Sequence, residues 1–381
     1  MMSSDSCIVG GPWASDFTLK AHSVRQCGGG GRRLWLDVCR SLAIGLVVLI
    51  HATQAVFPRN ELGLFEGSLF YSFAISIGRL GVPLFLLMTG WLVVGKRFDD
   101  ARDVLAFYRR SLFSLLLTIE FWIPLIFLVR NYFGAATDFQ MLLRQMLFLE
   151  VVPGAFWWYI PTIIPLYIMA PFISIVLDSV SPRALLVPIS FVLLYGFAPR
   201  LLTVSGILFG IEWLEVSSTL SVTYAMGVYG LYMVLGFYCR RYWEKLAGVK
   251  TVWLVIVLSI SIAAGFLVSY SGKIDLWYSD FSVLVAGVAL FILLRRRFED
   301  VGFSPLRKAA RFVSKTSFAV YFLHAAVLEQ VAPMCRILPF QCSIKATCAF
   351  VVTAVTVYSL VGAGWMVLGF FPRARKVVFH A

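Results

Sequence analysis

The chain has 381 residues, of which 60% are hydrophobic and only 14% are charged. Soluble domains carry about 25% charged and 45–50% apolar residues, and the mean hydropathy of this chain is +0.85. Because the apolar excess extends over nearly the whole chain, we exclude a water-soluble globule and an intrinsically disordered protein. The formal net charge of +13 indicates basic cytoplasmic loops of a membrane protein, and we expect no nucleic-acid partner.

Residues 1–33 differ in composition from the rest of the chain. They are polar and Gly-rich, and they lack the apolar core of about 7–15 residues that a signal peptide contains. We expect a flexible cytoplasmic tail over 1–33, followed by a transmembrane domain over 34–381.

Ten apolar segments follow the tail. Each is long enough for a helix to cross about 30 Å of hydrocarbon at 1.5 Å per residue. The sequence therefore predicts an all-α integral membrane protein, a polytopic bundle of about ten transmembrane helices. The segments are 36–57, 69–94, 111–130, 156–177, 185–204, 221–239, 251–270, 279–295, 312–334 and 346–371.

The distribution of Lys and Arg predicts the orientation of this bundle. With the N-terminus inside, 25 of these residues fall on the cytoplasmic side, seven fall outside, and Arg79 lies within a span. Because cytoplasmic loops of membrane proteins carry the excess of positive charge, we expect both termini in the cytoplasm.

Four ionisable residues lie inside the predicted spans. They are His51, Arg79, Glu120 and His324, in spans one, two, three and nine. Counted from the ends of their spans, all four fall in the middle third of the bilayer. A charge in hydrocarbon is costly, so such residues usually face a cavity or a partner and mark a functional site.

The first span places two of its polar residues on one helix face. Arg40 and His51 are eleven residues apart, which is three helical turns plus about 20°. Asp37 precedes Arg40 by three residues and shares this face. His51 then lies about 16 Å deeper than Arg40. This arrangement suits a substrate with an anionic head in the cytoplasm and a reacting atom inside the membrane.

Aromatic residues accompany these groups. On span nine, Tyr321 and His324 share a face with Ser317. Trp158 and Tyr159 precede span four at the expected outer interface. There they form either an aromatic belt or a surface on which a sugar stacks. No CxxC pair and no Cys/His spacing typical of a ligand set occurs, so we expect no metal site.

Several blocks resemble acyltransferase family 3, a family of membrane proteins. The first block, Leu36–Ala43 followed by His51, contains an Arg, ten further residues and a His, which is the hallmark of that family. The second block has Thr89-Gly90 where the family usually has Ser-Gly. The likeness covers about 34–371. The further blocks, in order, are 79–92, 108–110, 158–160 with Tyr167 and Pro171, and 317–324.

This resemblance implies an O-acyltransferase of the bacterial inner membrane. Members of the family transfer an acyl group, usually from cytoplasmic acetyl-CoA, to a sugar hydroxyl of a lipid-linked or exported polysaccharide. The segment Gly81-Val82-Pro83-Leu84-Phe85 is similar to the corresponding segment of the subgroup of enterobacterial-common-antigen O-acetyltransferases. The expected partners are therefore acyl-CoA, a glycan acceptor and the lipid bilayer.

The donor is expected to bind at the cytoplasmic end of the first span. The CoA phosphates cannot enter hydrocarbon, so we expect Arg40, helped by Arg109 or Arg110, to hold them. His51 then acts as the general base, or forms an acyl-imidazole intermediate. Asp37 belongs to the same substrate-binding face.

The other intramembrane groups complete the expected site. Arg79 stabilises the oxyanion of the transition state, and Glu120 orients His51 or balances the charge of Arg79. Tyr321 and His324 bind the acceptor or assist proton transfer.

Two other functions fit the same residues. A transporter that flips a glycan lipid or a small anion also places ionisable groups in the membrane, although no internal repeat supports it. A sensor or scaffold without activity is the second alternative, and it requires no chemistry from Arg40 and His51.

Overall fold

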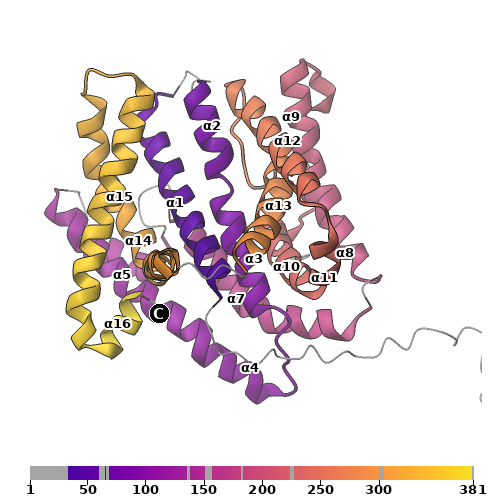
Figure 1. Cartoon of the computed structure of the whole chain (residues 1–381), viewed down its shortest axis with the longest axis horizontal. Coiled ribbons are helices and arrows are strands. Elements are labelled where there is room, and N and C mark those ends of the chain that lie inside the picture. The colour runs from indigo at the N-terminus through magenta and orange to yellow at the C-terminus, as the bar shows by residue number, and fades with distance from the viewer. Residues whose placement is uncertain are drawn as a thin grey trace, which may run out of the picture. The chain divides into compact units, whose positions relative to one another are not determined.

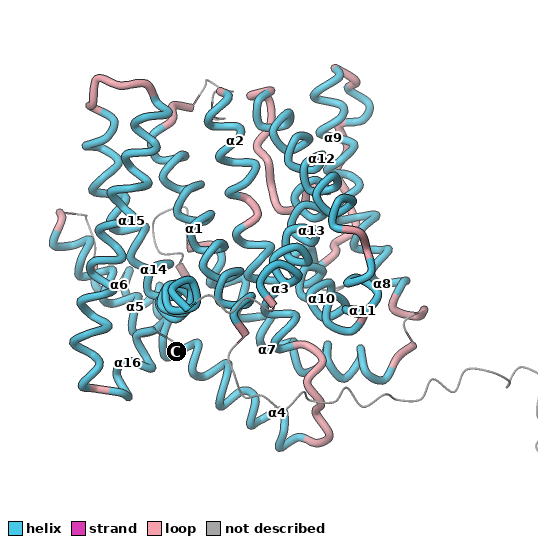
Figure 2. Tube along the Cα trace, viewed as in Figure 1, coloured by secondary structure: helices cyan, strands magenta, loops and turns pink. Residues whose placement is uncertain are grey.

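The computed structural model describes most of the chain after the tail. The described residues are 33–59, 65, 68–134, 138–150, 157–181, 183–223, 227–299 and 304–379. The predicted tail, apart from Arg33, lies outside this part. Within the described residues the secondary structure is helical and contains no strand (Figure 2).

Every apolar segment of the sequence corresponds to one helix or to a helix in several pieces. In the N-terminal half these are α1 (Leu34–Val56), α2 (Leu69–Gly78), α3 (Gly81–Val93), α4 (Ala101–Phe107), η1 (Tyr108–Leu112), α5 (Phe113–Tyr132), α6 (Phe139–Met146), α7 (Tyr159–Ser179), α8 (Leu186–Val192), η2 (Leu193–Phe197), α9 (Ala198–Phe209) and η3 (Glu212–Leu214). In the C-terminal half they are α10 (Gly227–Arg241), α11 (Trp243–Gly248), α12 (Thr251–Tyr270), α13 (Phe281–Phe298), α14 (Ser304–Arg336), α15 (Cys342–Val367), η5 (Leu368–Phe370) and α16 (Pro372–Phe379).

The prediction of an all-α membrane protein is confirmed. Among the described residues, eight helices are long and apolar enough to cross a membrane. The two other predicted spans correspond to α10, with 15 residues, and α13, whose last turn carries three arginines. The count of ten spans, and the side on which the termini lie, stay predictions.

The third span begins about ten residues earlier than the apolar run indicates. A helix continues from Ala101 to Tyr132 through α4, the π-helical turn η1 and α5. Asp100 starts it, because its Oδ1 accepts the backbone N–H groups of Arg102 and Asp103 at 2.8 and 3.0 Å. Charged residues 102, 103, 109 and 110 therefore lie within the helix and not in a loop before it.

The second span is interrupted in its middle. Helix α2 ends at Gly78, Arg79 and Leu80 form a turn, and α3 begins at Gly81. Pro83 has no N–H group to donate to the carbonyl of Arg79, which removes one hydrogen bond of a continuous helix. The interruption therefore places Arg79 at a helix end inside the span.

Helix α1 lies at the centre of the bundle. It contacts α2, α3, α13, α14 and α15 (Figure 1). Of these neighbours, α3 also packs closely against α10. Because α1 contacts both the interrupted second span and the long helix α14, residues of three predicted spans meet around it.

Candidate functional site

Helix α1 carries the predicted polar face without a break. Both Arg40 and His51 belong to it, so the expected separation of about 16 Å along the axis holds. The Asp37 side chain is buried one turn before Arg40, which is half-buried. His51 is 8% exposed at the deeper end.

His51 meets the second predicted histidine. Its ring stacks on that of His324, with the ring centroids 5.5 Å apart and the planes at 28°. His324 is fully buried on α14, and its Nδ1 lies 3.1 Å from the carbonyl oxygen of Val320. In the tautomer in which Nδ1–H donates a hydrogen bond to that carbonyl, the neutral ring of His324 keeps Nε2 as an acceptor.

Arg79 lies close enough to act electrostatically on His51. Its guanidinium carbon lies 4.5 Å from the ring centroid of Trp277 and 5.1 Å from that of Tyr278. Its Nη1 donates to the Tyr278 hydroxyl at 3.4 Å. The side chain is 5% exposed, and its Nε has no hydrogen-bond partner within the described residues. A buried donor without a partner is costly, and a bound oxygen atom would satisfy it.

Two glycines explain why Arg79 comes so close to α1. A Cβ on Gly78 would lie 2.9 Å from Cβ of Ile50, and one on Gly81 would lie 2.7 Å from the carbonyl oxygen of Ala43. Only residues without a side chain allow this approach. Because Gly78 adjoins Arg79 and Ile50 adjoins His51, the glycine contact sets the distance between the two functional residues.

Tyr321 and Tyr159 continue the site from His324. The ring centroid of Tyr321 lies 5.8 Å from that of His324 and 6.0 Å from that of Tyr159. Tyr159 in turn begins α7, next to Trp158. Residues from two separate blocks of the sequence, Tyr159 from one and Tyr321 and His324 from the other, thus form one row of rings.

A cluster of four aromatic residues borders the site beside Arg79. We define it as Trp158, Tyr229, Trp277 and Tyr278. The ring of Trp158 lies 5.1, 5.5 and 6.0 Å from those of Tyr278, Tyr229 and Trp277. Sequence analysis missed the three residues other than Trp158, because they lie far along the chain in a loop and a short helix. The pair Trp277-Tyr278 just before a predicted span was the available signal.

A partly buried ion pair holds the loop that carries Trp277 and Tyr278. The Arg200 Nε donates to Asp280 Oδ1 at 3.2 Å, and the backbone N–H of Trp277 donates to Asp280 Oδ2 at 2.6 Å. Arg200 also donates to the carbonyl of Asp275.

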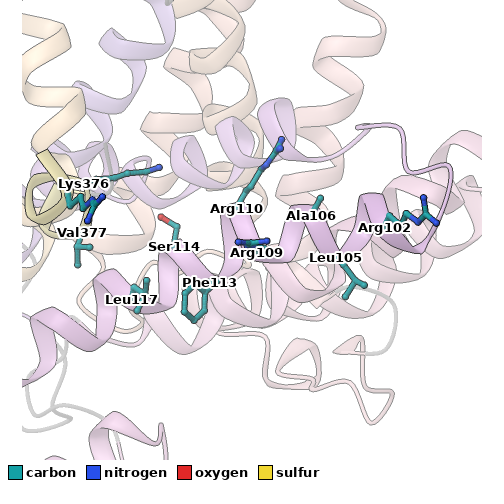
Figure 3. Close-up of a pocket in the computed structure, with 11 residues that line it drawn as sticks. Arg102, Leu105, Ala106, Arg109, Arg110, Phe113, Ser114, Leu117, Lys376 and Val377 are labelled. Atoms are coloured by element: carbon teal, nitrogen blue, oxygen red, sulfur yellow. The ribbon is translucent and has the colours of Figure 1, made fainter.

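On the Arg40 side, the site is bordered by α7. The guanidinium of Arg40 lies close enough to Tyr159 and Tyr167 to interact electrostatically with their hydroxyl groups. Tyr167 stacks on Phe107, with the ring centroids 6.4 Å apart. Arg109 and Arg110 lie just beyond Phe107, where they line a pocket between α4–α5 and α16 (Figure 3). No residue of α1 lines that pocket, so Arg40 and these two arginines occupy separate sites. The two sites adjoin through the stacked rings of Phe107 and Tyr167.

Glu120 is the predicted site residue that the structure does not bring to the others. It lies half-buried on α5, and it makes no hydrogen bond or ion pair with His51 or Arg79. The close neighbours of helix α5 include α6, α14 and α16. The expectation that Glu120 orients His51 or neutralises Arg79 therefore has no support from the geometry.

The described residues contain no group of three or more His, Cys, Asp or Glu side chains arranged to hold a metal ion.

A comparison with protein families decides which of the three predicted classes applies. The model of a family described as an acyltransferase domain, that of acyltransferase family 3, matches residues 33–368. The chain belongs to acyltransferase family 3. No significant match was found among the curated proteins or the solved structures.

The match to acyltransferase family 3 includes every site residue predicted from the sequence. It includes Arg40 and His51 on α1, Arg79 between α2 and α3, and the His324 face of α14. It ends before α16. The protein is thus a multi-pass membrane acyltransferase whose last helix lies beyond the matched region.

Proposed function

We propose that this acyltransferase moves an acyl group, most simply acetyl, from cytoplasmic acyl-CoA to a sugar hydroxyl of a lipid-linked or exported polysaccharide. The observation that carries the proposal is the position of His51. It is buried three turns beyond Arg40 on one helix, and it adjoins Arg79 and His324. The protein then belongs in the bacterial inner membrane, where donor and acceptor approach from opposite sides.

The donor enters from the Arg40 end. Guanidinium groups suit phosphate because they donate two parallel hydrogen bonds. Arg40, with Arg109 and Arg110 in the adjoining pocket, holds the phosphates of CoA. The pantetheine arm then runs along α1 and brings the thioester carbonyl to His51. The half-buried position of Arg40 supports this role, since it leaves part of the side chain accessible.

The transfer itself requires a base and a stabilised oxyanion. His51 takes the proton of the sugar hydroxyl as its oxygen attacks the thioester carbonyl. The carbonyl oxygen becomes negative and accepts a hydrogen bond from Arg79, whose Nε is otherwise unpartnered. The C–S bond then breaks, and the CoA thiolate recovers the proton from His51. In the alternative route the acyl group passes first to His51 and then to the sugar.

The acceptor binds at the aromatic cluster. Sugars present C–H faces that pack on aromatic rings, and the cluster offers four such rings next to Arg79. Tyr321 and His324 lie between the cluster and His51, where they position the hydroxyl or pass on its proton.

Purified protein in nanodiscs tests the proposal. With radiolabelled acetyl-CoA and a glycan-lipid extract, His51→Ala is expected to lower the transfer rate about a hundredfold or more, since it removes the general base. Arg40→Ala is expected to raise the KM for the donor as well. Arg97→Ala changes an exposed arginine that pairs with Asp99 and serves as the control. Glycan movement across the membrane that needs no CoA would instead establish the transporter.

A further inference from the structure

A pocket between α4–α5 and α16 forms a second, strongly basic feature beside the His51 site. It has a volume of about 1000 Å³ and lies between helices from opposite ends of the domain (Figure 3). Residues of α4, η1 and α5 recur along one wall, and α16 supplies the other. Its size is at the upper end of the range for sites of small ligands, about 300–1,000 Å³.

The charges of this pocket all have one sign. None of the described residues that line it is acidic. Like charges gathered in one hollow repel each other, so an anion with several charges is the ligand that such a site favours. The five cations of the pocket are Arg102, Arg109, Arg110, Arg373 and Lys376.

Contacts on its other face fix α16 in this position. The indole N–H of Trp122 donates to the carbonyl of Val378 at 2.9 Å. Phe379 is buried against Trp365, and the guanidinium carbon of Arg375 lies 3.4 Å from the centroid of the Trp365 ring. With these residues turned to the protein, Arg373 and Lys376 remain exposed and line the pocket.

The pocket adjoins the donor end of the α1 face. Phe107 precedes Arg109 and Arg110 on the same helix, and its ring stacks on that of Tyr167. Tyr167 lies close enough to Arg40 for an electrostatic interaction. In addition, the Tyr108 hydroxyl donates to the carbonyl of Ile168 at 2.7 Å. The stacked rings of Phe107 and Tyr167 thus link the helix that carries Arg109 and Arg110 to the surroundings of Arg40.

We propose that this pocket binds the phosphates of the CoA nucleotide, the 3′-phosphate above all, and that α16 completes the donor site through Arg373 and Lys376. The inference rests on the proposed function, because it assigns part of the donor. The 3′-phosphate and the diphosphate of CoA together carry roughly four negative charges at pH 7. Five cations match this number better than they match the head group of one phospholipid.

An anionic phospholipid is the other ligand that would bring a phosphate group to this pocket. The apolar side chains of Leu105, Phe113 and Leu117 are exposed in the pocket wall and would pack on acyl chains. A lipid, however, needs no 3′-phosphate on a ribose, and it reaches the pocket from the bilayer whether or not CoA is added. These two differences separate the sources by experiment.

The first experiment measures binding directly, without acyl transfer. Calorimetry of the full chain in phosphatidylcholine nanodiscs compares CoA with dephospho-CoA, which lacks the 3′-phosphate. We expect wild-type protein to bind CoA at least about tenfold more tightly than dephospho-CoA, because dephospho-CoA cannot make the charge-assisted hydrogen bonds of the 3′-phosphate. Lys376→Glu and Arg373→Glu should remove this preference. Arg183→Glu makes the same charge change at an exposed residue outside the pocket and should keep it.

The second experiment needs no variant. An amine-reactive ester labels Lys376 of the wild-type protein, and mass spectrometry follows the labelling. Saturating CoA is expected to protect Lys376 several-fold, dephospho-CoA less, and Lys245 outside the pocket not at all. Equal labelling with and without CoA would overturn the inference.

The remaining outcomes separate this inference from the proposed function. Binding of CoA that depends on Lys376 without any acyl transfer would leave the site intact and remove the function. Normal transfer and an unchanged CoA affinity in Lys376→Glu would leave the function and overturn the site. Retention of phosphatidylglycerol that depends on Lys376 and that CoA does not displace would assign the pocket to lipid and overturn the proposal.

Discussion

Arg79 combines three properties that rarely occur together in a membrane protein. It is buried, it makes no ion pair within the described residues, and one of its nitrogens has no hydrogen-bond partner there. The rings of Trp277 and Tyr278 compensate part of its charge through cation–π contacts. A charge kept in this state is expensive, which favours a role in binding a substrate oxygen over a structural role.

We predict that Arg79→Lys lowers kcat by about 10²–10³, the usual effect of losing one oxyanion donor. Lysine keeps the charge, but its compact ammonium group cannot reproduce the forked donor geometry of the guanidinium. The measurement is the steady-state rate of acyl transfer at saturating donor. Arg130→Lys serves as the control, because Arg130 pairs with Glu329 on α14 away from His51. A kcat within twofold of wild type would remove Arg79 from the mechanism.

The sequence predicts the site only as far as local geometry reaches. Arg40 and His51 lie on one helix, so the spacing alone places them on one face. His51 and His324 were expected at a similar depth, and in the structure their two rings stack. The depth of a residue in the membrane, however, does not determine toward which neighbouring helix its side chain points. Glu120 lies at a similar predicted depth and yet makes no hydrogen bond or ion pair with His51 or Arg79.

At the scale of elements, apolar runs predict the spans well because the bilayer sets their length. The ten predicted segments all correspond to helical pieces. The beginning of the third span was wrong by ten residues, because Asp100 caps a helix whose first turns are polar. The interruption at Arg79 was also missed. Gly78, Gly81 and Pro83 carried that signal, which becomes meaningful only when α1 is known to pack against them.

Helices α3 and α10 cross at a pair of glycines. A Cβ on Gly90 would collide with the carbonyl of Met233, and a Cβ on Gly236 would collide with the carbonyl of Leu87. Each helix therefore lets the backbone of the other approach closely, as small residues do at helix interfaces in membranes. This crossing fixes α10, which carries Tyr229 of the aromatic cluster.

We predict that Gly90→Ala and Gly236→Ala each destabilise the protein by about 1–3 kcal/mol, the usual cost of overpacking a dense interface. The thermal unfolding midpoint in detergent is the measurement, and both variants should unfold at lower temperature than wild type. Gly45→Ala is the matched control, since a Cβ there meets no atom within 4 Å. An unchanged midpoint in both interface variants would show that the helices can separate without cost.

At the scale of the whole molecule, contacts between helix ends bear on the number of spans. The Arg240 and Arg241 side chains at the end of α10 donate to the carbonyls of Trp91 and Leu177, both at 3.1 Å. The ends of α3, α7 and α10 therefore lie on one side. On the other, Lys273 donates to the carbonyl of Ile207 near the end of α9, at 3.4 Å.

Helix α13 spans the same distance as α12. It begins next to the loop of Lys273, and at its far end Arg296 donates to the carbonyl of Val249, just before α12 begins. Since α12 is long and apolar enough to cross the membrane, α13 returns across the same thickness. On this interpretation, which stays a prediction, the three arginines of its last turn lie on the cytoplasmic side, as the distribution of positive charge predicts.

These contacts lead to a topology that labelling can test. If α10 and α13 both cross, Lys250 lies in the cytoplasm and Lys273 lies outside. If neither crosses and eight helices span, the two positions exchange sides. In a variant without native cysteines, we expect a membrane-impermeant maleimide to label Lys273→Cys in right-side-out vesicles and Lys250→Cys only after lysis. Arg97→Cys and Lys345→Cys are the controls, because both schemes place Arg97 inside and Lys345 outside. The opposite labelling of Lys250→Cys and Lys273→Cys would establish eight spans and would place Trp277 and Tyr278 on the cytoplasmic side, away from Trp158, so that the aromatic cluster would not be an acceptor site.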